Sequence, residues 1–200
     1  MKKFTMALLL SVCSSLAVAE GDPEAGKALT AVCGACHGID GNSPVSAWPK
    51  IAGQNEKYLL KQLRDIKSGD RSVPTMAGQL DAMSDQDLEN IAAYFASQTS
   101  TKGTAKEELV ALGESIYRAG VADKGVAACT ACHSPTGKGN APAGYPALSG
   151  QWADYTALSL RAFRSEERKN DGDSKIMRDI AYRLSDKEID AVSSYIEGLR

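Results

Sequence analysis

Apolar residues recur at helical spacing in matching segments of the two halves of the chain. Residues 55–68 place Leu59 and Leu63 on one face and stop at Gly69, a usual signal for the end of a helix. Residues 153–163 repeat this pattern in the second half. Because a spacing of three and four residues puts side chains on one side of a helix, both segments are predicted to be amphipathic helices.

Two further helices are predicted where a capping sequence precedes an apolar stripe. Ser84 is followed three residues later by Asp87, and Ser185 is followed by Glu188, which is the spacing of a capping box. The apolar stripes that follow consist of Leu88, Ile91, Ala92 and Phe95 in the first half and Ile189, Val192, Ile196 and Leu199 in the second. The sequence has no strand-like alternation between tight hairpin turns. We therefore expect an all-α fold, with three or four helices in each half joined by long loops.

The second half of the chain repeats the first. Trp48-Pro49-Lys50-Ile51-Ala52-Gly53-Gln54 answers to Tyr145-Pro146-Ala147-Leu148-Ser149-Gly150-Gln151. Single residues match in the same way: Gly26 with Gly113, Tyr58 with Tyr155, Arg64 with Arg161, Arg71 with Arg168, Met76 with Met177 and Tyr94 with Tyr195. The polar segment 99–104 has the composition of a linker. This internal duplication predicts two tandem domains, residues 20–100 and residues 101–200.

Residues 1–19 have the features of a secretory signal peptide. A positive start at Lys2 precedes an apolar stretch over residues 6–12, and small residues at 17–19 form a cleavage site. This apolar run is shorter than the roughly 18 residues that a membrane span needs, and no later segment of the sequence is long enough. We therefore expect an exported chain that begins at Glu20 and is soluble or peripheral to the membrane.

Composition and charge narrow the range of partners. The chain is 43% hydrophobic and 24% charged, with a net charge of −2, so it lacks the strongly basic character expected of a protein that binds nucleic acid. Residues 20–100 carry a net charge of −4, whereas residues 101–200 are neutral. Such an imbalance can orient a protein toward its partners, although an ordinary solvated surface explains it equally well.

The two histidines of the chain each close a Cys-x-x-Cys-His sequence. These are Cys33-Gly-Ala-Cys36-His37 and Cys129-Thr-Ala-Cys132-His133, and this pattern is the attachment signature of c-type haem. The two thiols form thioethers with the haem vinyl groups, and the adjacent imidazole becomes an axial ligand of the iron. The sequence therefore predicts two covalently bound haem c groups, held by Cys33, Cys36, Cys129 and Cys132.

The second axial ligand of each iron has to be something other than histidine, because no further histidine is present. The methionines beyond the signal peptide are Met76, Met83 and Met177, and the repeat pairs Met76 with Met177. Met83 pairs with Leu184 in the repeat and is expected to be a core residue. We therefore predict that His37 and Met76 ligate one iron and that His133 and Met177 ligate the other, a ligand pair that raises the reduction potential.

Other residues that the repeat pairs are expected to support these ligands. A metal-bound histidine usually donates its other ring nitrogen to a backbone carbonyl, and Pro49 and Pro146 are candidates to offer one. Arg64, Arg71, Arg161 and Arg168 either pair with the haem propionates or lie on the surface. Tyr94 and Tyr195 are expected to pack the last helix of each half against the first, close to Gly26 and Gly113.

These residues together resemble the two-haem cytochrome c4 family. The resemblance covers residues 21–200 and rests on both haem motifs, on the Pro49 and Pro146 segments leading into Gly-Gln, on the stretch from Asp171-Gly172-Asp173 to Met177 and on the ending Ser193 to Ile196. It implies a periplasmic electron carrier that relays electrons from a quinol-oxidising bc1-type complex to a terminal oxidase. It also implies that the propionate edges of both haems meet at the domain interface. The first half departs from the pattern in its shorter approach to Met76.

The predicted ligands favour an electron carrier over an enzyme, because two filled axial positions leave no place for a substrate. The expected partners are therefore other redox proteins. An electron-accepting subunit of a dehydrogenase would have the same fold and haems and remains an alternative. A dihaem enzyme would need one iron with a weak or open sixth position. Two zinc sites, each with two cysteines and one histidine, would lack a fourth ligand at the usual spacing.

Overall fold

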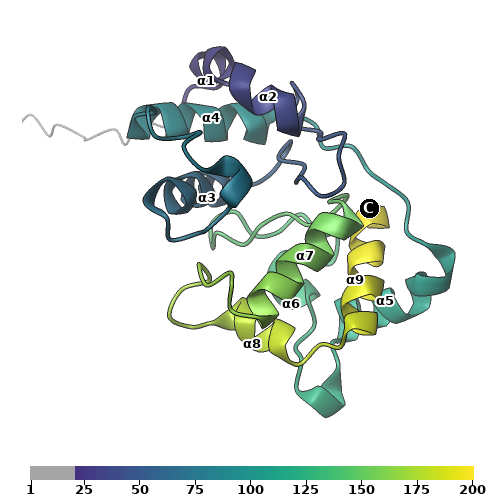
Figure 1. Cartoon of the computed structure of the whole chain (residues 1–200). Coiled ribbons are helices and arrows are strands. Elements are labelled where there is room, and N and C mark those ends of the chain that lie inside the picture. Colours follow the sequence, from purple (N-terminus) through teal and green to yellow (C-terminus); the bar gives the residue numbers. More distant parts are fainter. Residues whose placement is uncertain (1–20) are drawn as a thin grey trace, which may run out of the picture.

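The chain folds into helices and long loops (Figure 1), as a computed structural model describes for residues 21–200. Within this range the only strand-like contacts are isolated bridges from Val121 to Val126 and from Asn140 to Tyr145, so the predicted all-α fold is confirmed. The predicted signal peptide, residues 1–19, lies outside the described residues. No helix within residues 21–200 has the length and apolar character that crossing a bilayer demands.

The helices form two groups in chain order. The first group comprises α1 (Pro23–Leu29), α2 (Ala31–His37), α3 (Glu56–Ser68), the 3₁₀ helix η1 (Pro74–Met76) and α4 (Asp85–Ser97). The second group comprises α5 (Glu107–Ala119), the 3₁₀ helix η2 (Ala122–Lys124), α6 (Thr130–His133), α7 (Ala153–Arg164), α8 (Ile176–Tyr182) and α9 (Asp186–Gly198). The four amphipathic helices expected from the sequence are α3, α4, α7 and α9.

Both predicted capping boxes are present. At the start of α4 the backbone N–H of Ser84 donates to Asp87 at 2.8 Å, while the Ser84 hydroxyl accepts from the Asp87 backbone at 3.2 Å. Ser185 and Glu188 make the same exchange at the start of α9. These side chains satisfy backbone donors that the first turn of a helix leaves unpaired, and they fix where the last helix of each half begins.

The first and last helices of each half cross at a glycine. A Cβ atom on Gly26 would collide with the carbonyl oxygen of Asn90 in α4, and one on Gly113 would collide with that of Ala191 in α9. Only a residue without a side chain allows the helix backbones to approach so closely. The β-carbon of Tyr94 or Tyr195 lies beside each glycine, which confirms the expected role of these tyrosines.

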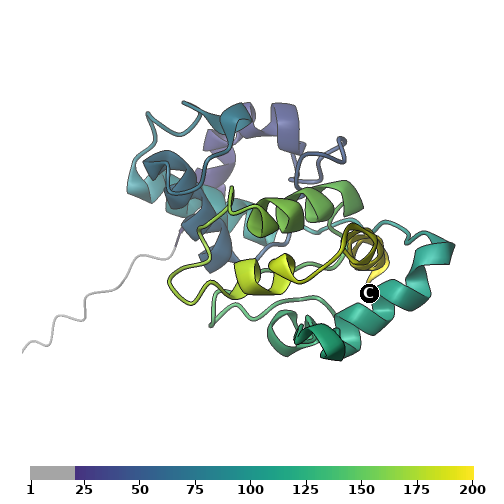
Figure 2. The same cartoon turned by 60° about the horizontal axis from the view of Figure 1, so that its bottom comes forward.

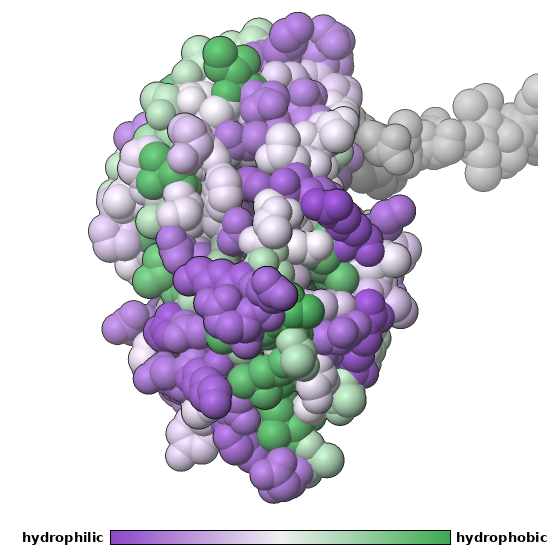
Figure 3. All heavy atoms as spheres, turned by 90° about the vertical axis from the view of Figure 1, so that its right-hand side faces the viewer, coloured by the Kyte–Doolittle hydropathy of each residue, from purple (hydrophilic) through white to green (hydrophobic). Residues whose placement is uncertain are grey.

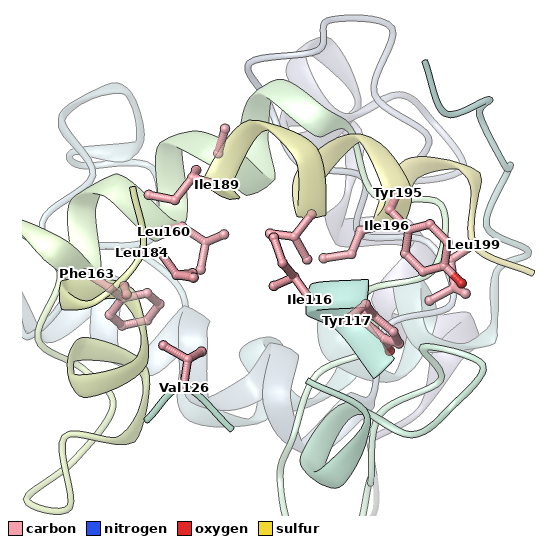
Figure 4. Packing of buried hydrophobic residues seen from close by; sticks show 13 residues of the cluster. Ile116, Tyr117, Val126, Leu160, Phe163, Leu184, Ile189, Tyr195, Ile196 and Leu199 are labelled. Atoms are coloured by element: carbon pink, nitrogen blue, oxygen red, sulfur yellow. The ribbon is translucent and has the colours of Figure 1, made fainter. Parts of the chain in front are cut away.

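Each half has its own apolar core. The first core lies between α3 and α4 and contains Leu59, Ile91 and Phe95. The second is larger and draws on helices α5, α7, α8 and α9. Figure 4 shows that the side chains of this second core surround an open centre instead of filling it.

The two halves meet at an interface of loops, the seam, which includes Lys50 and Gln54 of the first half and Ala147 and Gln151 of the second. The first half lies above the second in Figure 1, and Figure 2 shows this arrangement turned by 60°. The side chain of Gln54 bonds both backbone groups of Ala147, accepting at 2.7 Å and donating at 2.8 Å. Its repeat partner Gln151 bonds both backbone groups of Lys50, at 2.9 and 2.8 Å. Because Lys50 and Ala147 are themselves repeat partners, the halves exchange the same contact in both directions, as in a two-fold symmetric interface.

Candidate functional site

Both Cys-x-x-Cys-His motifs lie on or at the start of short helices, α2 and α6. Cys33, Cys36 and His37 belong to α2, and His133 closes α6. Residues three apart on a helix point the same way, so one turn presents two sulfur atoms side by side. The four cysteines of residues 21–200 form no disulfide. Burial raises the pKa of Cys33, and it raises the pKa of Cys129 to about 11, so these thiols are neutral at physiological pH.

Each motif histidine is oriented by a proline carbonyl. Nδ1 of His37 lies 2.9 Å from the Pro49 oxygen, and Nδ1 of His133 lies 3.0 Å from the Pro146 oxygen. The predicted role of the two prolines is thereby confirmed. Because Nδ1 is the donor in these bonds, Nε2 is the nitrogen that can bind a metal. Burial lowers the pKa of both histidines more than these bonds raise it, which favours the neutral imidazole that a metal requires.

The two motifs open into a cavity of about 840 Å³ that residues from both halves line. Apolar side chains dominate its wall, and this volume falls within the range of about 300–1,000 Å³ that is usual for sites of small molecules and cofactors. Met76 and Met177 both line this cavity. The structure therefore brings together all eight residues of the predicted haem sites: Cys33, Cys36, His37, Met76, Cys129, Cys132, His133 and Met177.

The third methionine lies elsewhere. Met83 packs, partly buried, against the core of the first half, and it is not among the described residues that line the cavity. This is the core position that the repeat predicted for it, since its repeat partner Leu184 is also a buried core residue.

The four paired arginines have two different roles. Arg64 forms ion pairs with Asp85 and Glu89, and it thereby ties α3 to α4. Arg161 joins α7 to α9 in the same way, through Asp186 and Asp190. For these two the surface interpretation holds. The other pair of the repeat, Arg71 and Arg168, instead lines the cavity.

Arg71 and Arg168 lie close together at the seam and cross it in opposite directions. Arg71 donates to the Tyr155 hydroxyl at 3.0 Å, and Arg168 donates to the Tyr58 hydroxyl at 2.9 Å. Both also donate to the single amide oxygen of Gln62, at 2.9 and 3.1 Å. Among residues 21–200, neither guanidinium has an ion pair with a carboxylate.

This cluster has an excess of positive charge. Burial alone would raise the pKa of Tyr155, but the charges of Arg71 and Arg168, together with hydrogen bonds from Arg71 and Ser159, outweigh it and lower the pKa to about 8. Two guanidinium groups beside an apolar cavity call for anionic oxygen atoms, and carboxylates are their best geometric match.

A haem c group fits these residues. Paired thiols can form two thioethers, a neutral imidazole and a thioether sulfur can ligate iron, and the arginines can pair with the propionates. Residues 21–200 contain no cluster of three or more His, Cys, Asp and Glu side chains that could hold a metal ion directly, so the zinc alternative gains no support.

Two groups of site residues were not assigned a role from the sequence. Gln54 and Gln151 form hydrogen bonds between the two halves. Tyr58 and Tyr155 accept hydrogen bonds from the cavity arginines Arg168 and Arg71. The signal that could have found them is their recurrence at equivalent positions of the repeat, since polar residues that recur between otherwise diverged halves point to a shared contact.

Comparisons with known proteins show the family of this chain. A family model described as cytochrome c matches residues 23–99 and again residues 110–200. Cytochrome c4 of Pseudomonas aeruginosa is 56% identical over the full length of both chains. The crystal structure of reduced recombinant cytochrome c4 from Pseudomonas stutzeri superposes with a TM-score of 0.89 at 55% identity, and the match covers 90% of this chain and all of that one.

A more distant relative bears a different name. The thiosulfate dehydrogenase electron acceptor of Stutzerimonas stutzeri strain A1501 is 35% identical, over 82% of this chain and 76% of its own length. This chain is thus similar over most of its length both to cytochromes c4 and to a protein named for its redox partner.

Proposed function

Because the chain belongs to the cytochrome c family and is a dihaem electron carrier of the cytochrome c4 type, we propose that it works in the periplasm and passes single electrons from a quinol-oxidising bc1-type complex to a terminal oxidase. The chain carries two covalently bound haem c groups. Bound haem c supplies a reversible one-electron couple, and the protein supplies the ligands and surroundings that set its potential.

We assign the attachment and ligand residues as the repeat pairs them. Cys33 and Cys36 form the thioethers in the first half, where His37 and Met76 are the axial ligands. In the second half the corresponding sets are Cys129 with Cys132 and His133 with Met177. The support for this assignment is that all eight residues line one cavity, and that each histidine keeps Nε2 free by donating from Nδ1.

The residues around these ligands act on the redox couple in three ways. Pro49 and Pro146 fix the plane and tautomer of each imidazole, which keeps the ligand geometry constant in both oxidation states. The apolar wall excludes water. The guanidinium groups of Arg71 and Arg168 would hold the propionates of the bound haem, which would neutralise charge at the seam.

The shared cavity is the observation that carries the proposal. Residues from both halves line it. The side chains of Gln54 and Gln151 hold the halves together, because each forms hydrogen bonds with the backbone of the opposite half. Two cofactors held in one continuous space can exchange an electron within the chain. One half can therefore accept an electron while the other delivers one.

The surface suits brief contacts with redox partners. Figure 3 shows hydrophilic and hydrophobic residues next to each other on one face of the molecule, and interfaces of non-obligate complexes are about as apolar as the rest of a protein surface. The proposed export rests on the sequence of residues 1–19, and the proposed donor and acceptor rest on the resemblance to the cytochrome c4 family.

A reduction assay tests the function. The purified protein is mixed with a bc1-type complex and quinol, and reduction of its haem bands is followed; a terminal oxidase is then added and reoxidation is followed. We expect both steps to proceed at a rate that depends on each complex, with two haems per chain by pyridine haemochrome. A protein that neither complex reduces or reoxidises would contradict the proposed place in the chain.

A second candidate is electron acceptor for a thiosulfate dehydrogenase. The observation that favours it is the relative of that name, which matches over most of this chain. Incubation with a thiosulfate dehydrogenase and thiosulfate distinguishes the two functions. Reduction that depends on both components supports the acceptor role, and reduction only by the bc1-type complex supports the respiratory role.

A further inference from the structure

The loops that carry the two cavity methionines begin alike and then diverge. The backbone N–H of Arg71 donates to the Asp65 oxygen at 2.9 Å, and that of Arg168 donates to the Ala162 oxygen at the same distance. The first loop then reaches Met76 five residues after its arginine, whereas the second reaches Met177 nine residues after its own. The extra residues of the second loop include Asp171.

Asp171 and Arg178 join the second loop to the first turn of α8, which contains Met177. The Asp171 carboxylate accepts from Nε of Arg178 at 2.7 Å and from its backbone N–H at 3.0 Å. Their side chains are only 5% and 11% exposed, so water screens this pair little. Nη2 of Arg178 also donates to the Gly172 oxygen at 2.9 Å. Because Arg178 directly follows Met177, these bonds fix the backbone on the C-terminal side of the methionine.

The first loop holds Met76 by local backbone bonds. Met76 ends the three-residue helix η1, where its N–H donates to the Val73 oxygen at 2.8 Å. The next residue, Ala77, has no polar side chain, and its N–H donates to the Pro74 oxygen at 3.2 Å. Among the described ion pairs, none joins two residues of the segment 69–83.

We propose that Asp171 and Arg178 are positioning residues that lock Met177 in place, and that Met76, which lacks such a lock, is the methionine that external ligands displace first. This inference rests on the proposed ligand assignment. An external ligand can bind the iron only when the methionine has moved away. The apparent affinity of that ligand is therefore its affinity for the open state multiplied by the fraction of molecules in the open state. Opening the second loop breaks a buried charged pair, which the first loop does not have to break.

Titration of the ferric wild-type holoprotein with imidazole tests this inference. The far-red charge-transfer band of methionine-ligated ferric haem reports how much methionine remains bound, and haem methyl NMR resonances, assigned with Met76→Ala and Met177→Ala, identify the site. We expect two steps, with the first site binding imidazole at least about tenfold more tightly, since a hydrogen bond to a charged group is worth at least that factor. A single step, or displacement of Met177 first, would overturn the proposal.

Variants of Asp171 and Arg178 provide the second measurement. Asp171→Asn is expected to raise the imidazole affinity of the second site about tenfold and to leave that of the first site unchanged. Arg178→Lys keeps the charge but loses the planar fork, so its effect should be intermediate. Arg161→Gln, which removes the two surface ion pairs with Asp186 and Asp190 in the same half, is the control and should change neither site. Equal affinities in the wild type and Asp171→Asn proteins would exclude the lock.

The same spectra distinguish a wrong proposal about the lock from a wrong ligand assignment. If the untreated ferric protein lacks the methionine band at both sites, the proposed His/Met coordination is wrong and the lock falls with it. If both bands are present but imidazole displaces the two methionines equally, the coordination stands and only the lock is refuted.

Discussion

Replacing Gln54 with alanine is expected to lower the free energy of unfolding by about 2–3 kcal/mol. Gln54 is 9% exposed, and its amide bonds both backbone groups of Ala147 across the seam, at 2.7 and 2.8 Å. Each of these bonds contributes about 1 kcal/mol, and any backbone group that water does not reach after the change adds a further cost. The alanine variant loses both bonds at once.

Urea unfolding followed by circular dichroism measures this loss, provided that the slope of the transition is unchanged. Gln98→Ala is the matched control, because the Gln98 amide bonds only Tyr94 and Ser97 within its own half and should cost less than about 1 kcal/mol. A loss for Gln54→Ala that is no larger than for Gln98→Ala would refute the role given to the seam amides.

The repeat supplies a second arm of this experiment. Gln151 makes the equivalent pair of bonds to Lys50, so Gln151→Ala should cost a similar amount. The double variant should cost less than the sum of the two single changes, because residues that hold one interface together act as a unit. Strict additivity would mean that the two amides stabilise their own halves and not the seam.

Three further predictions concern the helix crossing, the acid range and the cavity charges. Gly113→Ala should destabilise the protein by about 1–3 kcal/mol through overpacking against the Ala191 carbonyl, seen as a lower thermal midpoint; an unchanged midpoint would contradict the crossing geometry. The pKa of Glu188 is lowered to about 2, mainly by its bond to Lys124, so the stability it contributes is present above about pH 4.5 and is lost as the pH falls toward 2. The free energy of unfolding of Glu188→Gln should therefore fall less steeply with decreasing pH in that range than that of the wild type. The same pH dependence in both proteins would exclude this contribution. Arg168→Gln should lower at least one reduction potential by about 30–60 mV, which is at most about a tenfold change in a one-electron equilibrium. A potentiometric titration measures both potentials. If both are unchanged, the positive charge of Arg168 does not act on the cofactors.

Features that depend on neighbouring residues could be predicted from the sequence. The helical stripes, both capping boxes and the end of α3 at Gly69 follow from spacing within a few residues. The position of Met76 and Met177, and not Met83, in the wall of the cavity followed from the repeat, and the contacts of Pro49 and Pro146 with the histidines followed from what a ligating imidazole needs. Each of these inferences used either local geometry or the known demands of one chemical group.

Contacts between segments far apart in the chain could not be predicted in this way. The pairing of Gln54 with Ala147 and of Arg71 with Tyr155 depends on how the halves face each other, and helical periodicity contains no information about that orientation. The ion pair of Asp171 with Arg178 joins a loop to the first turn of α8, and an irregular loop has no period from which its contacts could be derived.

The crossed contacts mean that the two halves are not independent carriers joined by a linker. Arg71 belongs to the first half, yet its hydroxyl partner Tyr155 belongs to the second, and Arg168 with Tyr58 reverses this arrangement. A residue that bonds across the seam in both copies has to suit both sides at once, so a change in either copy alters the surroundings of both cofactors. The Met177 loop touches the first half through Asn170, which donates to Gln62 and Asp65, but the ion pair of Asp171 with Arg178 lies within the second half, so that part of the loop can differ without disturbing the seam. Divergence between the halves is therefore expected in the methionine loops, and the pseudo-symmetric contacts are expected to set the coupling between the two redox centres.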